Sequence, residues 1–271
     1  MAADLTGLLA DLAAETQVLD DLLAGLDGAG WQRPTPAPGW SIHDQVTHLA
    51  FFDESAALAA ADPDLFRTEA AALMALGDSF PDEIARRYRG LSGADALDWL
   101  RRSRAQYCHV FRGLEPRQRV PWFGPDMSAA SSVTARFMET WAHGQDVADA
   151  LGVARAPTAR LRHVAHLGVV TFRFTFQLNG LPVPPTPVRV ELTAPDDAGR
   201  WTWGPAGAAD VVTGPALDFC LVVTQRRHLD DTALRVTGPV AAQWMSIAQA
   251  FAGAPGPGRQ PGMARPGGGV R

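Results

Sequence analysis

The sequence has no lysine, so all 24 of its Lys+Arg residues are arginines, and they are outnumbered by 29 acidic residues. The net charge of -5 gives the chain no excess of positive charge with which to attract a phosphate backbone, and a nucleic-acid partner is therefore not expected. Many codons for alanine, glycine and proline are GC-rich. The absence of lysine beside many of these residues is therefore typical of a GC-rich genome.

Cysteine and long apolar runs are also scarce. Cys108 and Cys220 lie far apart in apolar segments and form no CxxC pair, which argues against cysteine-ligated zinc and favours reduced, buried thiols. No uncharged apolar run reaches the roughly 18 residues that a membrane span needs. The stretch Met1–Leu5 lacks the basic region and apolar core of a signal peptide. We therefore expect a cytoplasmic protein without a membrane partner.

What remains is the composition of an ordinary globular protein, with 271 residues, 46% of them hydrophobic and 20% charged. In the first half, apolar residues recur at steps of three and four, which predicts amphipathic helices. The predicted helices cover residues 5–26, 42–61, 64–76, 81–89, 93–112 and 129–151. This half is predicted to be a helical bundle.

The second half changes character after residue 180. Residues 188–193 alternate as a strand should, and shorter strands are predicted at 201–203, 209–213 and 233–237, with helices at 216–227 and 239–251. The fold class predicted is α+β, with a helical bundle over 1–155 and a smaller α+β domain over 156–252. A helical connector is predicted at 158–179, although its alternating phenylalanines would also suit a strand. A flexible Gly/Pro-rich tail is predicted over 253–271.

One helix start is marked unusually clearly. An extended, proline-rich segment runs from Trp31 to Trp40, and Ser41 then follows as an N-cap with Asp44 three residues on, which is a capping box. His48 lies one turn after Asp44 on this helix. An inward or cavity-facing position is therefore expected for its imidazole.

Glu139 and His143 are four residues apart on the predicted helix 129–151, so their side chains share one face. With His48 they make two imidazoles and one carboxylate, a catalytic-type zinc set with one open position. The same set also suits Fe(II), Mn, Co or Ni. Asp146 is a candidate acceptor for an imidazole N–H, or a charge on the helix surface. Other candidate ligands are His43, His163 and His166. The alternative is that these are ordinary histidines and that Glu139 is solvated, and spacing alone does not exclude it.

Taken together, these stretches resemble the DinB-like metalloprotein family. The residues that carry the resemblance are Trp31, the run Pro38-Gly39-Trp40-Ser41, Asp44, His48 and the stretch from Glu139 to Asp146. The match is to the branch of the mycothiol-dependent maleylpyruvate isomerase N-terminal domain. The resemblance implies a four-helix metal-binding bundle followed by a domain similar to sterol-carrier proteins. It also implies that His48, Glu139 and His143 bind a divalent metal, usually zinc.

The resemblance further implies an activity. Relatives use a low-molecular-weight thiol, mycothiol, as a cosubstrate that attacks a small electrophile, in an isomerase or S-transferase reaction. They also use an arginine of the second domain, for which Arg226 and Arg227 are the nearest counterparts here; a solvated helix end is the alternative for that pair. Two other functions stay open, a thiol-independent metal-dependent hydrolase or cyclase, and a non-catalytic metal- or ligand-binding accessory protein. The loop Trp122-Phe123-Gly124 receives no function, and the oligomeric state is not predicted.

Overall fold

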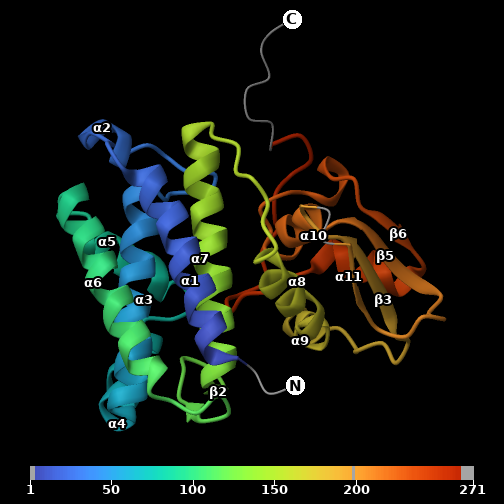
Figure 1. Cartoon of the computed structure of the whole chain (residues 1–271), viewed down its shortest axis with the longest axis horizontal. Helices are drawn as coiled ribbons and strands as arrows, with labels where there is room; N and C mark the ends of the chain where they lie inside the picture. Colours follow the sequence, from blue (N-terminus) through green and yellow to red (C-terminus); the bar gives the residue numbers. More distant parts are fainter. Residues whose placement is uncertain (1–3, 197–198, 264–271) are drawn as a thin grey trace, which may run out of the picture. The chain divides into compact units, whose positions relative to one another are not determined.

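The computed structural model describes residues 4–196 and 199–263, and Figure 1 shows its elements. The chain forms two compact units, Met1–Val153 and Ala154–Arg271. Each unit is described by itself. Within the described residues, no helix combines the length and the apolar character that crossing a membrane requires.

The first unit is built on four long helices, α1 (Leu5–Leu23), α3 (Ile42–Ala61), α6 (Gly93–Arg112) and α7 (Ala129–Leu151). Helix α3 packs against α6 and α7, and α1 packs against the same two helices, which closes a four-helix bundle (Figure 1). The bundle core consists of fully buried apolar side chains, among them Leu12, Leu49 and Phe137. The predicted helical first half is therefore confirmed.

Helix starts follow the local signals in the sequence. The side chains of Asp4, Ser41, Ser92 and Ser128 each cap the helix that follows, and Ser41 with Asp44 forms the predicted capping box. Shorter elements complete the unit: α2 (Gly28–Trp31), α4 (Pro63–Met74), α5 (Phe80–Tyr88), and strands β1 (Arg119–Val120) and β2 (Met127–Ser128). Strands β1 and β2 pair as an antiparallel ribbon around the loop that contains Trp122.

The second unit is α+β, as predicted. Its sheet has the order β4-β3-β5-β6, in which β3 is parallel to β5 and the other pairs are antiparallel. Its elements are α8 (Leu161–Val170), α9 (Phe172–Leu178), β3 (Val188–Thr193), β4 (Arg200–Trp203), β5 (Asp210–Pro215), α10 (Ala216–Val223), a 3₁₀ turn (Leu229–Asp231), β6 (Arg235–Thr237) and α11 (Pro239–Ile247). The helical interpretation of 172–178 is confirmed.

The two faces of this sheet differ. Val190, Leu192 and Val212 are fully buried, and helices α10 and α11 pack against the sheet. The cross-strand register places Glu191, Thr213 and Arg235 in one row, beside a hollow of about 380 Å³. The hollow is lined by Glu191, Thr193, Arg200, Thr213, Gly214, Ala233 and Arg235. Charged and hydroxyl side chains predominate there, which does not suit an apolar ligand.

Two predicted helix ends lie four residues too far along the chain. Helix α10 ends at Val223 rather than residue 227, because Gln225 adopts a left-handed φ of 58° and the Gln225 and Arg226 amides donate back to Val222 and Leu221. Helix α11 ends at Ile247 rather than 251, where the chain becomes extended and the Ala250 amide donates to the Val223 carbonyl. Of the predicted tail, 253–263 contains no helix or strand, and 264–271 lie outside the described residues.

Candidate metal centre

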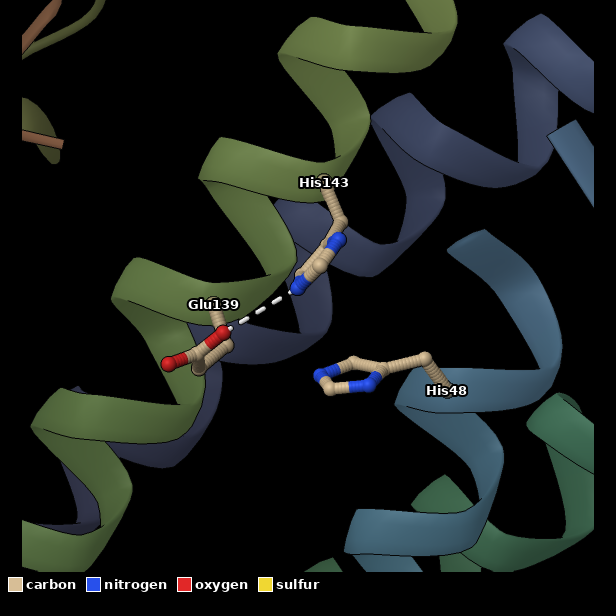
Figure 2. Close-up of side chains that lie close together, drawn as sticks. All are labelled: His48, Glu139 and His143. Carbon is tan, nitrogen blue, oxygen red and sulfur yellow. Dashed lines mark hydrogen bonds and ion pairs between the residues drawn. The ribbon is translucent and has the colours of Figure 1, made fainter. Parts of the chain in front are cut away.

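Helices α3 and α7 bring together the three side chains that the sequence singled out. His48, Glu139 and His143 each present a ligand atom, and these atoms lie within 4.8 Å of one another (Figure 2). His143 Nε2 and Glu139 Oε2 are 3.2 Å apart, and the centres of the two imidazole rings are 4.4 Å apart. The i, i+4 spacing on α7 therefore places both of its side chains toward the ring of His48.

This donor set fits a divalent metal. Ligand atoms at about 2.1 Å from a tetrahedral ion are separated from one another by about 3.4 Å. The His143 Nε2–Glu139 Oε2 distance is already 3.2 Å, and the other ligand-atom separations do not exceed 4.8 Å, so a metal would draw the side chains closer together. His48 and Glu139 are half-buried and His143 is buried, so the site is shielded yet reachable. Three ligands leave one position for a substrate atom.

A chain of hydrogen bonds that the sequence did not reveal sets which ring nitrogen of a neutral His143 carries the proton. Thr35 donates its hydroxyl proton to the Trp40 carbonyl, so it must accept from the Gln45 amide nitrogen, at 2.8 Å. The Gln45 oxygen then faces His143 Nδ1 and accepts its proton. A proton on Nδ1 leaves Nε2 as the nitrogen that can bind a metal. Gln45 therefore contacts Nδ1, while the unprotonated Nε2 and the Glu139 oxygen lie side by side as two electron-pair donors, an arrangement that suits a bound cation. Asp146 is fully buried, so it is not a charge on the helix surface.

Trp40 covers the two imidazoles. Its ring lies 5.1 Å from that of His48 and stacks at 6.0 Å on that of His143, with an interplanar angle of 16°. The indole N–H donates to Asp82 Oδ1 at 2.7 Å, which holds the ring in place from helix α5. The second tryptophan of the proline-rich segment is therefore part of the site.

An aromatic cluster lies beside His48 and gives the unassigned loop a position. The ring of Phe52 is 4.6 Å from that of His48 and 5.4 Å from that of Phe123. Trp122 stacks on Phe66 with an interplanar angle of 7°. The loop between β1 and β2 thus supplies an apolar wall next to one of the candidate ligands.

The other histidines named from the sequence are placed differently. His43 is buried, its Nε2 donates to the Leu91 carbonyl at 3.1 Å, and burial lowers its pKa. This contact holds α3 against the segment before α6. His163 and His166 lie on α8 in the second unit and are not part of the group that contains His48. The pKa of His166 is lowered mainly by burial, and further by the positive charges of His163 and Arg162.

Arg226 and Arg227 follow the end of α10 rather than lying on it. Arg226 Nη1 donates to the Thr224 carbonyl at 2.6 Å, and its guanidinium lies 6.0 Å from the centre of the Phe251 ring. Arg227 Nη1 donates to the Arg226 carbonyl at 2.7 Å. Both therefore belong to the turn that the left-handed Gln225 creates, and their part in catalysis stays a prediction.

Two segments of the chain match known protein families. Residues 12–148 match the family described as the mycothiol maleylpyruvate isomerase N-terminal domain, and residues 184–237 match a family described as wyosine base formation. Two uncharacterized proteins from two strains of Mycobacterium tuberculosis are each 47% identical over 258 residues, which is 95% of this chain and 100% of theirs.

Two solved structures share the fold. The crystal structure of the mycothiol-dependent maleylpyruvate isomerase is 17% identical with a TM-score of 0.56, and a mutant of that enzyme is 16% identical with the same score. Each alignment covers 85% of this chain and 92% of the other. Identities this low extend the likeness to the fold alone.

Proposed function

The chain belongs to the family of the mycothiol maleylpyruvate isomerase N-terminal domain, and on that premise we propose that it is a metal-dependent enzyme that uses mycothiol. The reaction is an isomerisation of a small electrophile assisted by the thiol, or a transfer of the thiol to it. One observation carries the proposal: His48, Glu139 and His143 converge within the matched domain, with their ligand atoms within 4.8 Å of one another.

In this proposal His48, Glu139 and His143 hold a divalent metal, with zinc as the first choice for a set of two imidazoles and one carboxylate. When bound, the metal supplies a Lewis acid that favours the thiolate form of a thiol ligand. Gln45 keeps the proton of His143 on Nδ1, so that Nε2 stays available. Trp40 lies against both rings and excludes water from that side.

The second unit has a binding role in the proposal. Arg226 or Arg227 binds a carboxylate of the substrate, since a guanidinium can donate two parallel hydrogen bonds to it. Charge reversal at the productive arginine should then raise KM for an anionic substrate without changing the metal content. An unchanged KM for the anionic substrate in both Arg226→Glu and Arg227→Glu would argue against a substrate-binding role.

The metal centre is tested by elemental analysis of the purified protein, which should contain about one zinc per chain. His143→Ala should lose the metal. His43→Gln is the matched control, because His43 lies on the same helix as His48 but donates to the Leu91 carbonyl instead. Full metal content in His143→Ala would show that the ligand assignment is wrong.

The thiol is tested by calorimetric titration of mycothiol into the metal-loaded protein and into metal-stripped protein. Binding to the loaded form alone supports the proposal. Absence of binding to the loaded form would favour a thiol-independent metal-dependent hydrolase or cyclase. A protein that binds neither thiol nor substrate, yet retains its zinc, would be a metal-binding accessory protein.

A further inference from the structure

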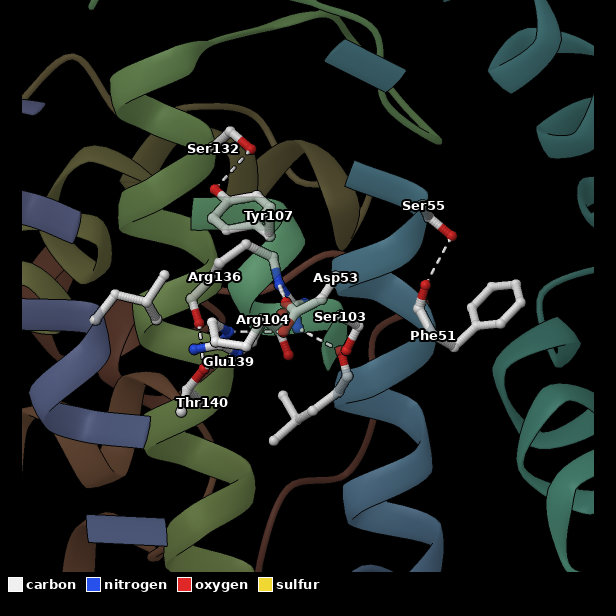
Figure 3. Close-up of polar contacts among 12 residues, drawn as sticks. Phe51, Asp53, Ser55, Ser103, Arg104, Tyr107, Ser132, Arg136, Glu139 and Thr140 are labelled. Atoms are coloured by element: carbon white, nitrogen blue, oxygen red, sulfur yellow. Dashed lines mark hydrogen bonds and ion pairs between the residues drawn. The ribbon is translucent and has the colours of Figure 1, made fainter. Parts of the chain in front are cut away.

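A second polar cluster lies inside the bundle, one turn from the candidate metal centre (Figure 3). Asp53 is fully buried and receives two guanidinium groups: Arg104 Nε donates to its Oδ2 at 2.6 Å, and Arg136 Nε donates to its Oδ1 at 2.9 Å. Both arginine side chains are buried, with 6% and 4% of their surface exposed. We call Asp53, Arg104 and Arg136 the buried triad.

The triad connects all four helices of the bundle. Asp53 is on α3, Arg104 on α6 and Arg136 on α7, and Arg104 Nη1 also donates to the Thr16 hydroxyl on α1 at 2.6 Å. The same guanidinium donates through Nη2 to the Thr140 hydroxyl on α7 at 2.9 Å. A cluster that contacts every helix can fix how far each one slides along its neighbours.

Two of these contacts end directly beside metal-ligand candidates. Arg136 Nη2 donates to the carbonyl of Leu49, the residue after His48, at 3.2 Å. The Thr140 hydroxyl, which accepts from Arg104, belongs to the residue after Glu139 and donates to the Arg136 carbonyl at 2.7 Å. The triad therefore ties the backbone next to the ligand on α3 to the helix that carries the other two.

A metal centre shared between two helices needs this kind of control. Each residue of an α-helix advances the chain by about 1.5 Å, whereas metal–ligand distances tolerate only about 0.2 Å. Apolar packing alone permits small slides at little cost, but charged groups paired inside a bundle are satisfied in only one arrangement. Buried ion pairs are not a general source of stability, and their best-attested use is to specify register.

We propose that Asp53, Arg104 and Arg136 are positioning residues for the metal centre, which hold α3 and α7 at the register where His48 meets Glu139 and His143. The inference rests on the metal binding proposed above. None of the three is among the candidate metal ligands. The triad acts through the positions of the two helices.

The test is the zinc affinity of folded Arg136→Met, measured by competition with a chromophoric chelator while circular dichroism monitors the fold. Methionine keeps a long unbranched side chain but loses the bonds to Asp53 and to the Leu49 carbonyl. Affinity should fall about 10- to 100-fold, the range seen when groups that orient metal ligands are removed. The visible spectrum of the cobalt(II)-substituted variant should also shift, because the coordination geometry changes.

Arg101→Met is the matched control. It breaks a bidentate pair with Asp20 that joins α6 to α1 on the bundle surface, at 2.7 and 2.8 Å, and it should leave zinc affinity within twofold of the unmodified protein. The positioning role is overturned if Arg136→Met has reduced thermal stability but binds zinc with an affinity within twofold of the unmodified protein.

Arg136→Lys decides the question if Arg136→Met does not fold. Lysine keeps the charge but cannot donate to Asp53 and the Leu49 carbonyl in the same geometry. Affinity weakened more than twofold supports the inference, and affinity within twofold contradicts it. Failure of the unmodified protein to bind zinc would instead refute the proposed metal site itself.

Discussion

Gln45→Met separates the support of the metal centre from its ligands. Methionine matches the length of glutamine and its unbranched shape, but it neither accepts from His143 Nδ1 nor donates to Thr35 as Gln45 does. The three candidate ligands stay in place. The imidazole of His143 is then free to rotate and to carry its proton on either nitrogen, so the fraction of molecules with Nε2 ready to bind a metal falls.

The size of the effect follows from these contacts. Loss of a partner that orients a ligating histidine weakens metal binding about 10- to 100-fold, which corresponds to about 1.4–2.7 kcal/mol. The two hydrogen bonds of Gln45 each contribute about 0.5–1.5 kcal/mol to folding, so the metal-free variant should be about 1–3 kcal/mol less stable. Both quantities are measurable on one protein, by chelator competition and by urea unfolding.

Two variants isolate the contact with the histidine. Gln45→Glu keeps an acceptor at His143 Nδ1 and should bind zinc at least as tightly as the unmodified protein, because a carboxylate is the stronger acceptor. Thr35→Val removes the partner of the Gln45 amide nitrogen without touching the imidazole. It should weaken zinc binding less than Gln45→Met does, because the Gln45 oxygen can still accept from Nδ1. Equal zinc affinities for Gln45→Met and Gln45→Glu would refute the role assigned to the Nδ1 contact.

Three further outcomes are expected. Burial lowers the pKa of His43 below 6.5, so as the pH falls the unfolded state takes up a proton before the folded state does. The free energy of unfolding should therefore decrease as the pH drops below about 6.5. His43→Gln should flatten that decrease in urea titrations between about pH 5 and 7.5. Gly93→Ala should cost about 1–3 kcal/mol of unfolding free energy, because its Cβ would lie 2.4 Å from the Trp31 ring, and a neutral result would contradict this packing. Zinc at 100 times its Kd should add about 2.7 kcal/mol of stability, so chelation should lower the Tm of the unmodified protein but not that of His143→Ala.

Local patterns account for the parts of the fold and site that the sequence predicted. The capping box of Ser41 and Asp44 is a contact over three residues, and the shared face of Glu139 and His143 is a consequence of helix geometry over four. Such signals need no knowledge of the tertiary structure. Pairing His48 with them needed the further inference that two helices of a bundle face each other.

What the sequence did not predict depends on distant partners. Gln45 is 98 residues from His143, and Asp53 is 51 and 83 residues from its two arginines. A polar residue in a helix gives no local sign that it will be buried. The end of α10 was missed for another reason: Gln225 takes a left-handed conformation that glycine usually adopts, so no turn residue marks it.

The proline-rich segment shows why the resemblance rested on residues outside the ligand set. Thr35 fixes which end of the Gln45 amide faces His143, and Trp40 lies against both imidazoles. The segment does not run extended as predicted but folds back on itself, with the Thr35 amide donating to the Trp40 carbonyl and Pro34 bridged to Ser41. This turn and the prolines fix its course, so the hydroxyl and the indole reach the site without being ordered by it. The motif from Trp31 to Ser41 therefore reports the environment of the histidines. A protein with the three ligands but without these contacts should bind zinc more weakly. The zinc affinity of the double variant Trp40→Ala, Thr35→Val tests this directly.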